Sequence, residues 1–219
     1  MVASVQVRYD TELVFVDRWM PWIDWRLHCN MRKAIREEIA SIEPFDALEC
    51  AHREDALAWV DSGVELCRTQ KPATPPKHLV SYFVLVDHDH VLLVDHKNAR
   101  LWLPSGGHVE PGEHPRTTVV RELREELGLE LTDAPEAPLM LTISETVGIS
   151  AGHVDVSLWY VIHADRRRAL EFDPAEFYSV QWFHSNEAPV LRSDPHLQRF
   201  LRKLALAGRQ PDRARKDTD

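Results

Sequence analysis

The most informative part of the sequence is GHVEPGEHPRTTVVRELREELGL, residues 107–129. Its second half predicts a helix from Pro115 to Leu127. At 100° per residue, Val119, Val120, Leu123 and Leu127 form one apolar stripe, which would face a core. A glycine-containing loop leads into this helix, so the stretch predicts a loop followed by an amphipathic helix.

Three carboxylates, Glu122, Glu125 and Glu126, share the face of this helix next to the apolar stripe. Like charges three or four residues apart repel by about 0.2–0.5 kcal/mol per pair, so their clustering indicates a function. Mg²⁺ is commonly bound by one or two carboxylates together with substrate phosphates. Arg121, one turn before Glu125, can pair with it and orient it. These four residues predict a divalent-cation site.

The glycines of the preceding loop, Gly106, Gly107 and Gly112, permit backbone conformations that are closed to other residues. Loop carbonyls and amides can therefore approach a metal ion or a phosphate closely. The loop and the helix together predict one site.

Residues 107–129 resemble the signature of the Nudix hydrolases. That signature is Gly, five residues, Glu, seven residues, Arg-Glu, an aliphatic residue, any residue, Glu-Glu, any residue, Gly and an aliphatic residue. With the surrounding strands, the resemblance covers about residues 79–183, and nothing before Pro75. The sequence supplies every fixed position: Gly107, Glu113, Arg121, Glu122, Leu123, Glu125, Glu126, Gly128 and Leu129.

The resemblance implies an α/β fold, an α/β/α sandwich around a mixed sheet. It also implies a Mg²⁺ or Mn²⁺ site made by Glu122, Glu125 and Glu126 with the Gly107 carbonyl. The implied enzyme is a pyrophosphohydrolase that acts on phosphorus-containing anhydrides, in which bound ions neutralise phosphate charge and activate a water. Glu113 is expected to support the loop or the start of the helix.

The catalytic residues implied are Glu125 or Glu126 as the general base, with Arg121 positioning them. In this family the base can also lie outside residues 107–129, so Glu145 and Asp155, on strands expected to pass nearby, are alternatives. Further candidates for substrate contact are His108 within the loop and Arg100 just before the short strand that precedes it. Glu145 and Asp155 are also candidates for this role, and residues 152–155 could aim one polar side chain at the site.

The prolines of residues 71–78 predict a linker between two parts of the chain. Residues 1–70 are expected to form a mainly helical appendage, with one helix capped by Asn30 and a second capped by Asp46. Residues 79–207 are expected to form the catalytic domain, and residues 208–219 a fraying tail. The expected strands cover residues 11–16, 78–86, 91–94, 101–103, 139–147, 154–164 and 179–183, with a loop at residues 104–107 and a closing helix at residues 195–206.

Composition excludes several classes of protein. The net charge of −9 argues against binding to extended nucleic acid or to anionic membranes. No apolar run reaches the roughly 20 residues of a membrane span. Three cysteines without a C-x-x-C pair fit a reduced, cytoplasmic setting. Trp19, Trp22 and Trp25 fit a core stripe better than a dimer surface, and the sequence leaves a homodimer open.

The substrate expected by elimination is a small-molecule nucleotide, a nucleoside triphosphate or a related nucleoside diphosphate derivative. Two alternatives stay open: an ADP-ribose or nucleotide-sugar pyrophosphatase, and a non-catalytic Nudix-like module that senses a ligand. Loss of the signature carboxylates would mark the module, and none is lost. An isopentenyl diphosphate isomerase would need a cysteine in the catalytic domain, whereas Cys29, Cys50 and Cys67 all precede the proline-rich segment.

Overall fold

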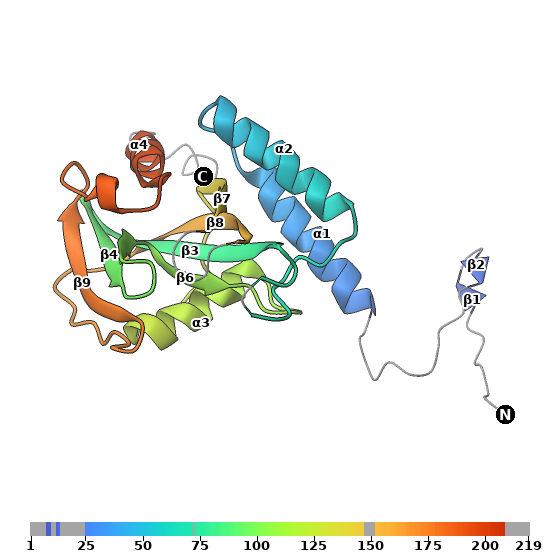
Figure 1. The fold of residues 1–219 in the computed structure, drawn as a ribbon, viewed down its shortest axis with the longest axis horizontal. Coiled ribbons are helices and arrows are strands. Elements are labelled where there is room, and N and C mark those ends of the chain that lie inside the picture. Colours follow the sequence, from blue (N-terminus) through green and yellow to red (C-terminus); the bar gives the residue numbers. More distant parts are fainter. Residues whose placement is uncertain (1–7, 10–11, 14–24, 72, 147–151, 209–219) are drawn as a thin grey trace, which may run out of the picture.

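A seven-stranded mixed sheet forms the middle layer of the computed structural model (Figure 1). The structure describes residues 8–9, 12–13, 25–71, 73–146 and 152–208, with side chains from Met31 onward. Two short strands, β1 (Arg8–Tyr9) and β2 (Glu12–Leu13), pair with each other. The sheet contains β3 (Lys77–Asp87), β4 (His90–His96), β5 (Leu101–Leu103), β6 (Ser105–His108), β7 (Met140–Glu145), β8 (Val154–His163) and β9 (Phe177–His184).

The long strand β3 is the axis of the sheet. It pairs in parallel with β8 along one edge, and antiparallel with β4 and β6 along the other. The prediction of a loop at residues 104–107 was wrong, because β6 begins at Ser105. A Cβ on Gly106 would lie 2.1 Å from the Ser81 carbonyl oxygen. The missing side chain therefore lets the segment approach β3 closely enough to pair with it.

Helices cover both faces of the sheet, as the α/β/α prediction requires. One apolar cluster joins β3 and β8 to α1 (Trp25–Ser41), α2 (Ala47–Asp61) and α3 (Pro115–Leu127). A second cluster, on the other face, contains Trp159 and is closed by α4 (Leu197–Ala207). Since successive side chains of a strand point to opposite faces, β3 contributes alternate residues to the two clusters.

The two N-terminal helices begin differently from one another. The predicted cap at Asn30 was wrong, because α1 starts at Trp25 and Asn30 lies inside it. The predicted cap of α2 is confirmed: the Asp46 side chain accepts a hydrogen bond of 2.9 Å from the Glu49 amide. Asp46 satisfies one of the orphan amides of the first turn, which is what a cap does.

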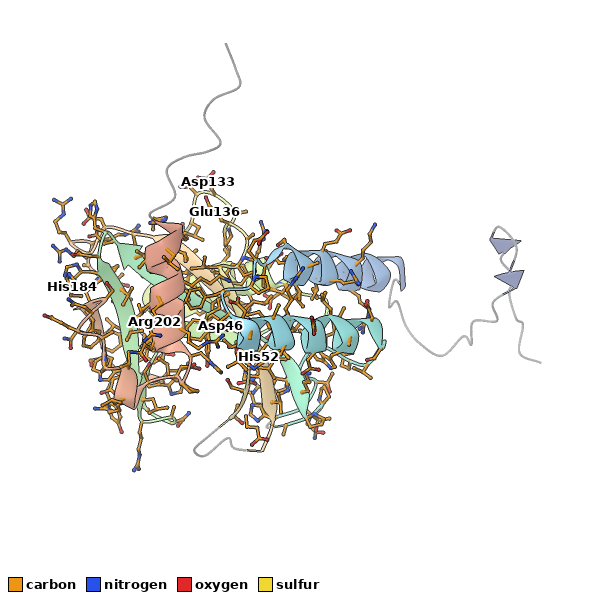
Figure 2. All side chains as sticks on the ribbon, turned by 90° about the horizontal axis from the view of Figure 1, so that it is seen from above. Asp46, His52, Asp133, Glu136, His184 and Arg202 are labelled. Carbon is orange, nitrogen blue, oxygen red and sulfur yellow. The ribbon has the colours of Figure 1, made fainter. Side chains whose placement is uncertain are left out.

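Both N-terminal helices are joined to the sheet domain by polar contacts. The buried Glu38 of α1 accepts a hydrogen bond from the Tyr160 hydroxyl of β8 at 2.9 Å. Arg199 of α4 forms a bidentate ion pair with Asp46, which Figure 2 shows at the end of α2 nearest α4. The helices thus share the core of the sheet domain, and the division at residues 71–78 stays a prediction.

Several expectations concern residues that the structure does not describe. Trp19 and Trp22, most of the strand expected at residues 11–16, and residues 209–219 lie outside the described ranges, as does the side chain of Trp25. Within the described part of the chain, no helix is long and apolar enough to cross a membrane.

Candidate active site

The helix that carries the carboxylates, α3, begins and ends where the sequence predicted. The Nδ1 of His114 accepts a hydrogen bond from the Arg116 amide, and Pro115 occupies the first helical position. Gly128 ends the helix in the left-handed conformation, with φ of 62°. A proline at the start and a left-handed glycine after the end are strong helix boundaries, so the spacing of the carboxylates is fixed.

The buried face of α3 differs from the predicted stripe at one position. Val119, Leu123 and Leu127 are fully buried, as predicted. Including Val120 was wrong, because this side chain is 39% exposed, whereas Thr118 is fully buried. The stripe is thus centred closer to Val119 than the predicted angles placed it, which leaves the adjacent face to the carboxylates.

A cavity of about 800 Å³ lies against this carboxylate face. Its walls come from α3, the β6 segment, β3, the turn after β4 and residues 68–71. Glu122, Glu125 and Glu126 all line it, together with Gly107 and Arg121. Small-molecule sites are typically of roughly 300–1,000 Å³, so the cavity has the size of a nucleotide site.

Glu126 is the most buried of the three carboxylates. Its Oε2 accepts hydrogen bonds from the Ser105 hydroxyl at 2.5 Å and from the Gly106 amide at 3.0 Å. Burial, followed by the negative charges of Glu122 and Glu176, raises the pKa of the Glu126 carboxyl to about 8. A cation beside this group would favour its charged form.

Glu122 packs against the backbone of the loop. A Cβ on Gly107 would lie 1.9 Å from Oε1 of Glu122, so only glycine leaves room for the carboxylate there. The same oxygen accepts a hydrogen bond from Arg121 at 2.6 Å. Burial raises the pKa of the Glu122 carboxyl, although Arg121 opposes the shift.

Arg121 holds the loop and the carboxylates together. It donates two hydrogen bonds of 3.0 Å to Glu113, one of 3.2 Å to the His108 carbonyl and a longer one of 3.4 Å to Glu125. Glu113 also accepts a hydrogen bond from the Thr118 hydroxyl at 2.7 Å. Both carboxylate oxygens of Glu113 accept these hydrogen bonds, so Glu113 connects the loop to the first turns of α3.

The structure brings some of the other predicted residues to the cavity and leaves others out. His108 and Asp155 line it, and so does His153 from the 152–155 segment. Glu145 is exposed, and neither it nor Arg100 is among the described residues that line the cavity. His108 is largely buried, and burial followed by the charge of Arg68 lowers its pKa to about 2. His108 is therefore a neutral imidazole.

Sequence reasoning missed several charged residues of the cavity. Arg68 and Lys71 bring positive charge from the segment that was read as the edge of an appendage. Glu176, just before β9, adds a fourth carboxylate. Asp194 is buried, and burial raises its pKa to about 6. Of these, only Asp194 had a local signal, since an aspartate before Pro195 is typical of a helix start.

Known proteins resemble this chain in sequence and in fold. The family model described as "NUDIX domain" matches residues 76–204. The chain is 30% identical over 129 residues to a protein named "Uncharacterized Nudix hydrolase YvcI" from Bacillus subtilis (strain 168), covering 57% of this chain and 78% of that one.

Solved structures share the fold of the sheet domain. The E. coli dihydroneopterin triphosphate pyrophosphohydrolase superposes with a TM-score of 0.51 at 15% identity, covering 59% of this chain and 95% of its own. The MutT protein from Methanosarcina mazei Go1 gives a TM-score of 0.50 at 16% identity, covering 62% and 97%. At such identities these likenesses concern the fold alone.

Proposed function

Because the chain belongs to the Nudix hydrolase family, whose members cleave pyrophosphate bonds, we propose that it hydrolyses a nucleoside triphosphate or a related nucleotide with Mg²⁺ or Mn²⁺. The observation that carries the proposal is the convergence of Glu122, Glu125 and Glu126 on one wall of a nucleotide-sized cavity. The proposal also places the enzyme in the cytoplasm, consistent with the free thiols of Cys50 and Cys67.

The donor atoms at this wall fit a hard divalent cation. Carboxylate oxygens are the ligands that Mg²⁺ and Mn²⁺ prefer, and the Gly107 backbone lies beside Glu122. Burial, followed by neighbouring negative charge, raises the pKa of Glu122 and of Glu126, and a bound cation would offset both costs, so these shifts support the fit. When bound, such ions neutralise charge on the phosphates and acidify a water molecule.

The protein's own residues then have separate roles. Ser105 and Gly106 fix Glu126, and Arg121 fixes Glu122, so these two carboxylates are pre-positioned. Glu125 is held only by the 3.4 Å contact to Arg121, and its side chain is 52% exposed. We assign it the role of proton acceptor for the attacking water, because it is the carboxylate most free to move.

The lining of the cavity also includes cationic side chains and a further polar side chain. Arg68 and Lys71 face an anionic substrate from the segment before the proline-rich turn. The buried Asp194, which lines the cavity as Phe177 and Leu103 do, can exchange hydrogen bonds with the edge of a base. A charged end and a partly apolar end are the two features that a nucleotide requires.

The leading alternative keeps the reaction and changes the substrate to ADP-ribose or a nucleotide sugar. One panel of substrates separates the two proposed activities. It contains nucleoside and deoxynucleoside triphosphates, dinucleoside polyphosphates, ADP-ribose and nucleotide sugars, each assayed with Mg²⁺ or Mn²⁺. We expect a nucleoside monophosphate and pyrophosphate as products from a triphosphate, identified by chromatography. Hydrolysis of none of these compounds with either ion would favour the non-catalytic sensing module.

A further inference from the structure

A second group of ligand-type side chains comes from other elements than the carboxylates of α3, and three of its four members line the same cavity. The parallel register of β3 and β8 places His78 opposite Asp155, and His153 lies two residues before Asp155. His108 ends β6, which pairs beside His78 through Val80. Three segments that are distant in sequence thus bring three imidazoles and one carboxylate together.

The distances within this group suit a single ion. Oδ1 of Asp155 lies 3.2 Å from Nε2 of His78, 3.4 Å from Nε2 of His153 and 3.8 Å from Nε2 of His108. One ligand atom from each of the four residues lies within 4.8 Å of the others. Bonds of about 2.0–2.1 Å in a tetrahedral zinc site place neighbouring ligand atoms about 3.3 Å apart.

The hydrogen bonding of His78 leaves a lone pair aimed at a carboxylate. Its Nδ1 lies 2.9 Å from the Pro75 carbonyl, which can only accept, so Nδ1 carries a proton. In the neutral ring, Nε2 is then an acceptor facing Oδ1 of Asp155. Both atoms are buried and have no hydrogen-bond partner among the described residues. Two facing acceptors repel unless a cation or a second proton lies between them.

His153 is oriented in the same manner. Its Nδ1 lies 3.2 Å from the Thr146 hydroxyl oxygen, and that hydroxyl donates to the His153 carbonyl at 3.1 Å. This arrangement directs Nε2 of His153 toward Asp155. Histidine ligands of metal ions usually donate the other ring N–H to an oxygen in this way.

We propose that His78, His108, His153 and Asp155 bind one transition-metal ion of the zinc class, in a site distinct from the carboxylates of α3. Three imidazoles and one carboxylate favour ions such as Zn²⁺ or Co²⁺, whereas Mg²⁺ prefers oxygen ligands alone. The site does not depend on the proposed hydrolysis, because none of its four ligands is one of the α3 carboxylates.

Arg68 connects this site to the rest of the cavity. Its guanidinium lies 3.2 Å from Nε2 of His108, on the lone pair that a metal ion would take. Ligation by His108 therefore moves the Arg68 side chain, which itself lines the cavity. The ion and an anionic substrate are thus coupled through one arginine.

Cobalt is the probe that separates the two kinds of site. Tetrahedral Co²⁺ with nitrogen ligands absorbs visible light strongly, whereas Co²⁺ with six oxygen ligands absorbs weakly. The full chain, freed of metal with a chelator, should develop the strong absorption with one equivalent of Co²⁺. Zn²⁺ should abolish the absorption at one equivalent, and an excess of Mg²⁺ should leave it.

Variants locate the ion. Asp155→Asn and His108→Gln should each weaken Co²⁺ binding by more than about 100-fold, the upper end of what loss of a supporting residue does. His184→Gln is the matched control, because His184 belongs to a surface pair with Asp89 (2.8 Å), on β9 at the edge of the molecule in Figure 2. It should bind Co²⁺ like the wild type.

Circular dichroism verifies that each variant is folded. The ligand variants are placed at Asp155 and His108, which line the cavity, because a change at the fully buried His78 could prevent folding. Three results would overturn the proposal. The first is weak absorption only, which fits a doubly protonated His78 paired with Asp155. The second is strong absorption that survives both Asp155→Asn and His108→Gln. The third is absorption that is lost in the Glu122→Gln, Glu126→Gln double variant but kept in Asp155→Asn.

Discussion

Two groups of ionisable side chains meet at one cavity, one of them extending behind its wall to the buried His78, and they differ in how the fold supplies them. The carboxylates of α3 come from five consecutive residues of one helix, where burial, followed by the negative charges of Glu122 and Glu176, raises the pKa of Glu126 to about 8. The imidazole group comes from three strand segments and includes His108, which is neutral. The difference indicates two cation preferences within one pocket, hard ions at the helix and borderline ions at the strands.

The largest expected effect comes from removing a carboxylate of α3. Glu126→Gln should lower kcat by about 10²–10³-fold, the range for losing one preorganised charge-stabilising group. The strong Co²⁺ absorption of the imidazole group should not change. Steady-state kinetics with the best substrate of the panel measures the first effect. Glu130→Gln, an exposed residue just after the helix, is the control and should retain full activity.

The next effect concerns the arginine that positions the carboxylates. Arg121→Lys keeps the charge and loses the planar fork that reaches both Glu113 and Glu122. We expect kcat to fall by about 10–100-fold, as for other residues that orient metal ligands. Arg124→Lys, exposed on the same helix, should behave as the wild type. Equal loss in both variants would assign the effect to helix stability, which thermal unfolding measures.

A third prediction concerns Asp194, whose raised pKa results from burial and, in smaller part, from the charge of Asp155. Its pKa rises from 3.8 to about 6 on folding, so its contribution to stability is fully present below about pH 4 and is lost as pH rises through 6. Asp194→Asn should therefore stabilise the protein by about 2–3 kcal/mol at pH 8.

Urea unfolding at pH 5 and pH 8 measures this change. The stabilising effect should fall to about half at pH 5, and a difference that does not vary with pH would contradict the assigned shift. If Asp194 also contacts the base, the stabilised variant should show a raised KM. A stabilised variant with unchanged KM would leave Asp194 outside substrate binding.

The smallest expected effect separates two glycines of the loop. Gly107→Ala should displace the Glu122 carboxylate, which a new Cβ would meet at 1.9 Å, and lower activity about tenfold, at the low end for a disturbed ligand. Gly112→Ala meets nothing within 4 Å and has φ of 83°, so it should reduce stability by about 1–2 kcal/mol with little change in kcat. Steady-state kinetics and thermal melts of the two variants measure these effects. Unchanged activity in Gly107→Ala would show that the close contact has no role.

The difference between the helix carboxylates and the imidazole group also determines how much of the site the sequence could predict. Helix α3 and its carboxylates were predictable, because helical spacing alone places Glu122, Glu125 and Glu126 on one face and strong caps fix the ends. The imidazole group was only partly predictable. His108, His153 and Asp155 could be named as polar residues near the loop, but nothing local indicated His78, which joins them through strand register.

Two further misses have the same origin. Arg68 and Lys71 precede the proline-rich turn, so sequence reasoning assigned them to the edge of a separate appendage. The chain reverses after them and returns as β3, which places both residues on the cavity wall. The exposure of Val120 is a smaller error of the same kind, since the neighbours of a helix decide how wide its buried stripe is.

If the carboxylates of α3 hold the cations needed for hydrolysis, Mn²⁺ binding depends on them. Electron paramagnetic resonance counts free and bound Mn²⁺ in the wild type, in the Glu122→Gln, Glu126→Gln double variant and in Asp155→Asn. We expect Mn²⁺ to bind to the wild type and to Asp155→Asn, and we expect both binding and activity to be lost in the double variant. Unchanged Mn²⁺ binding and activity in the double variant would contradict this expectation.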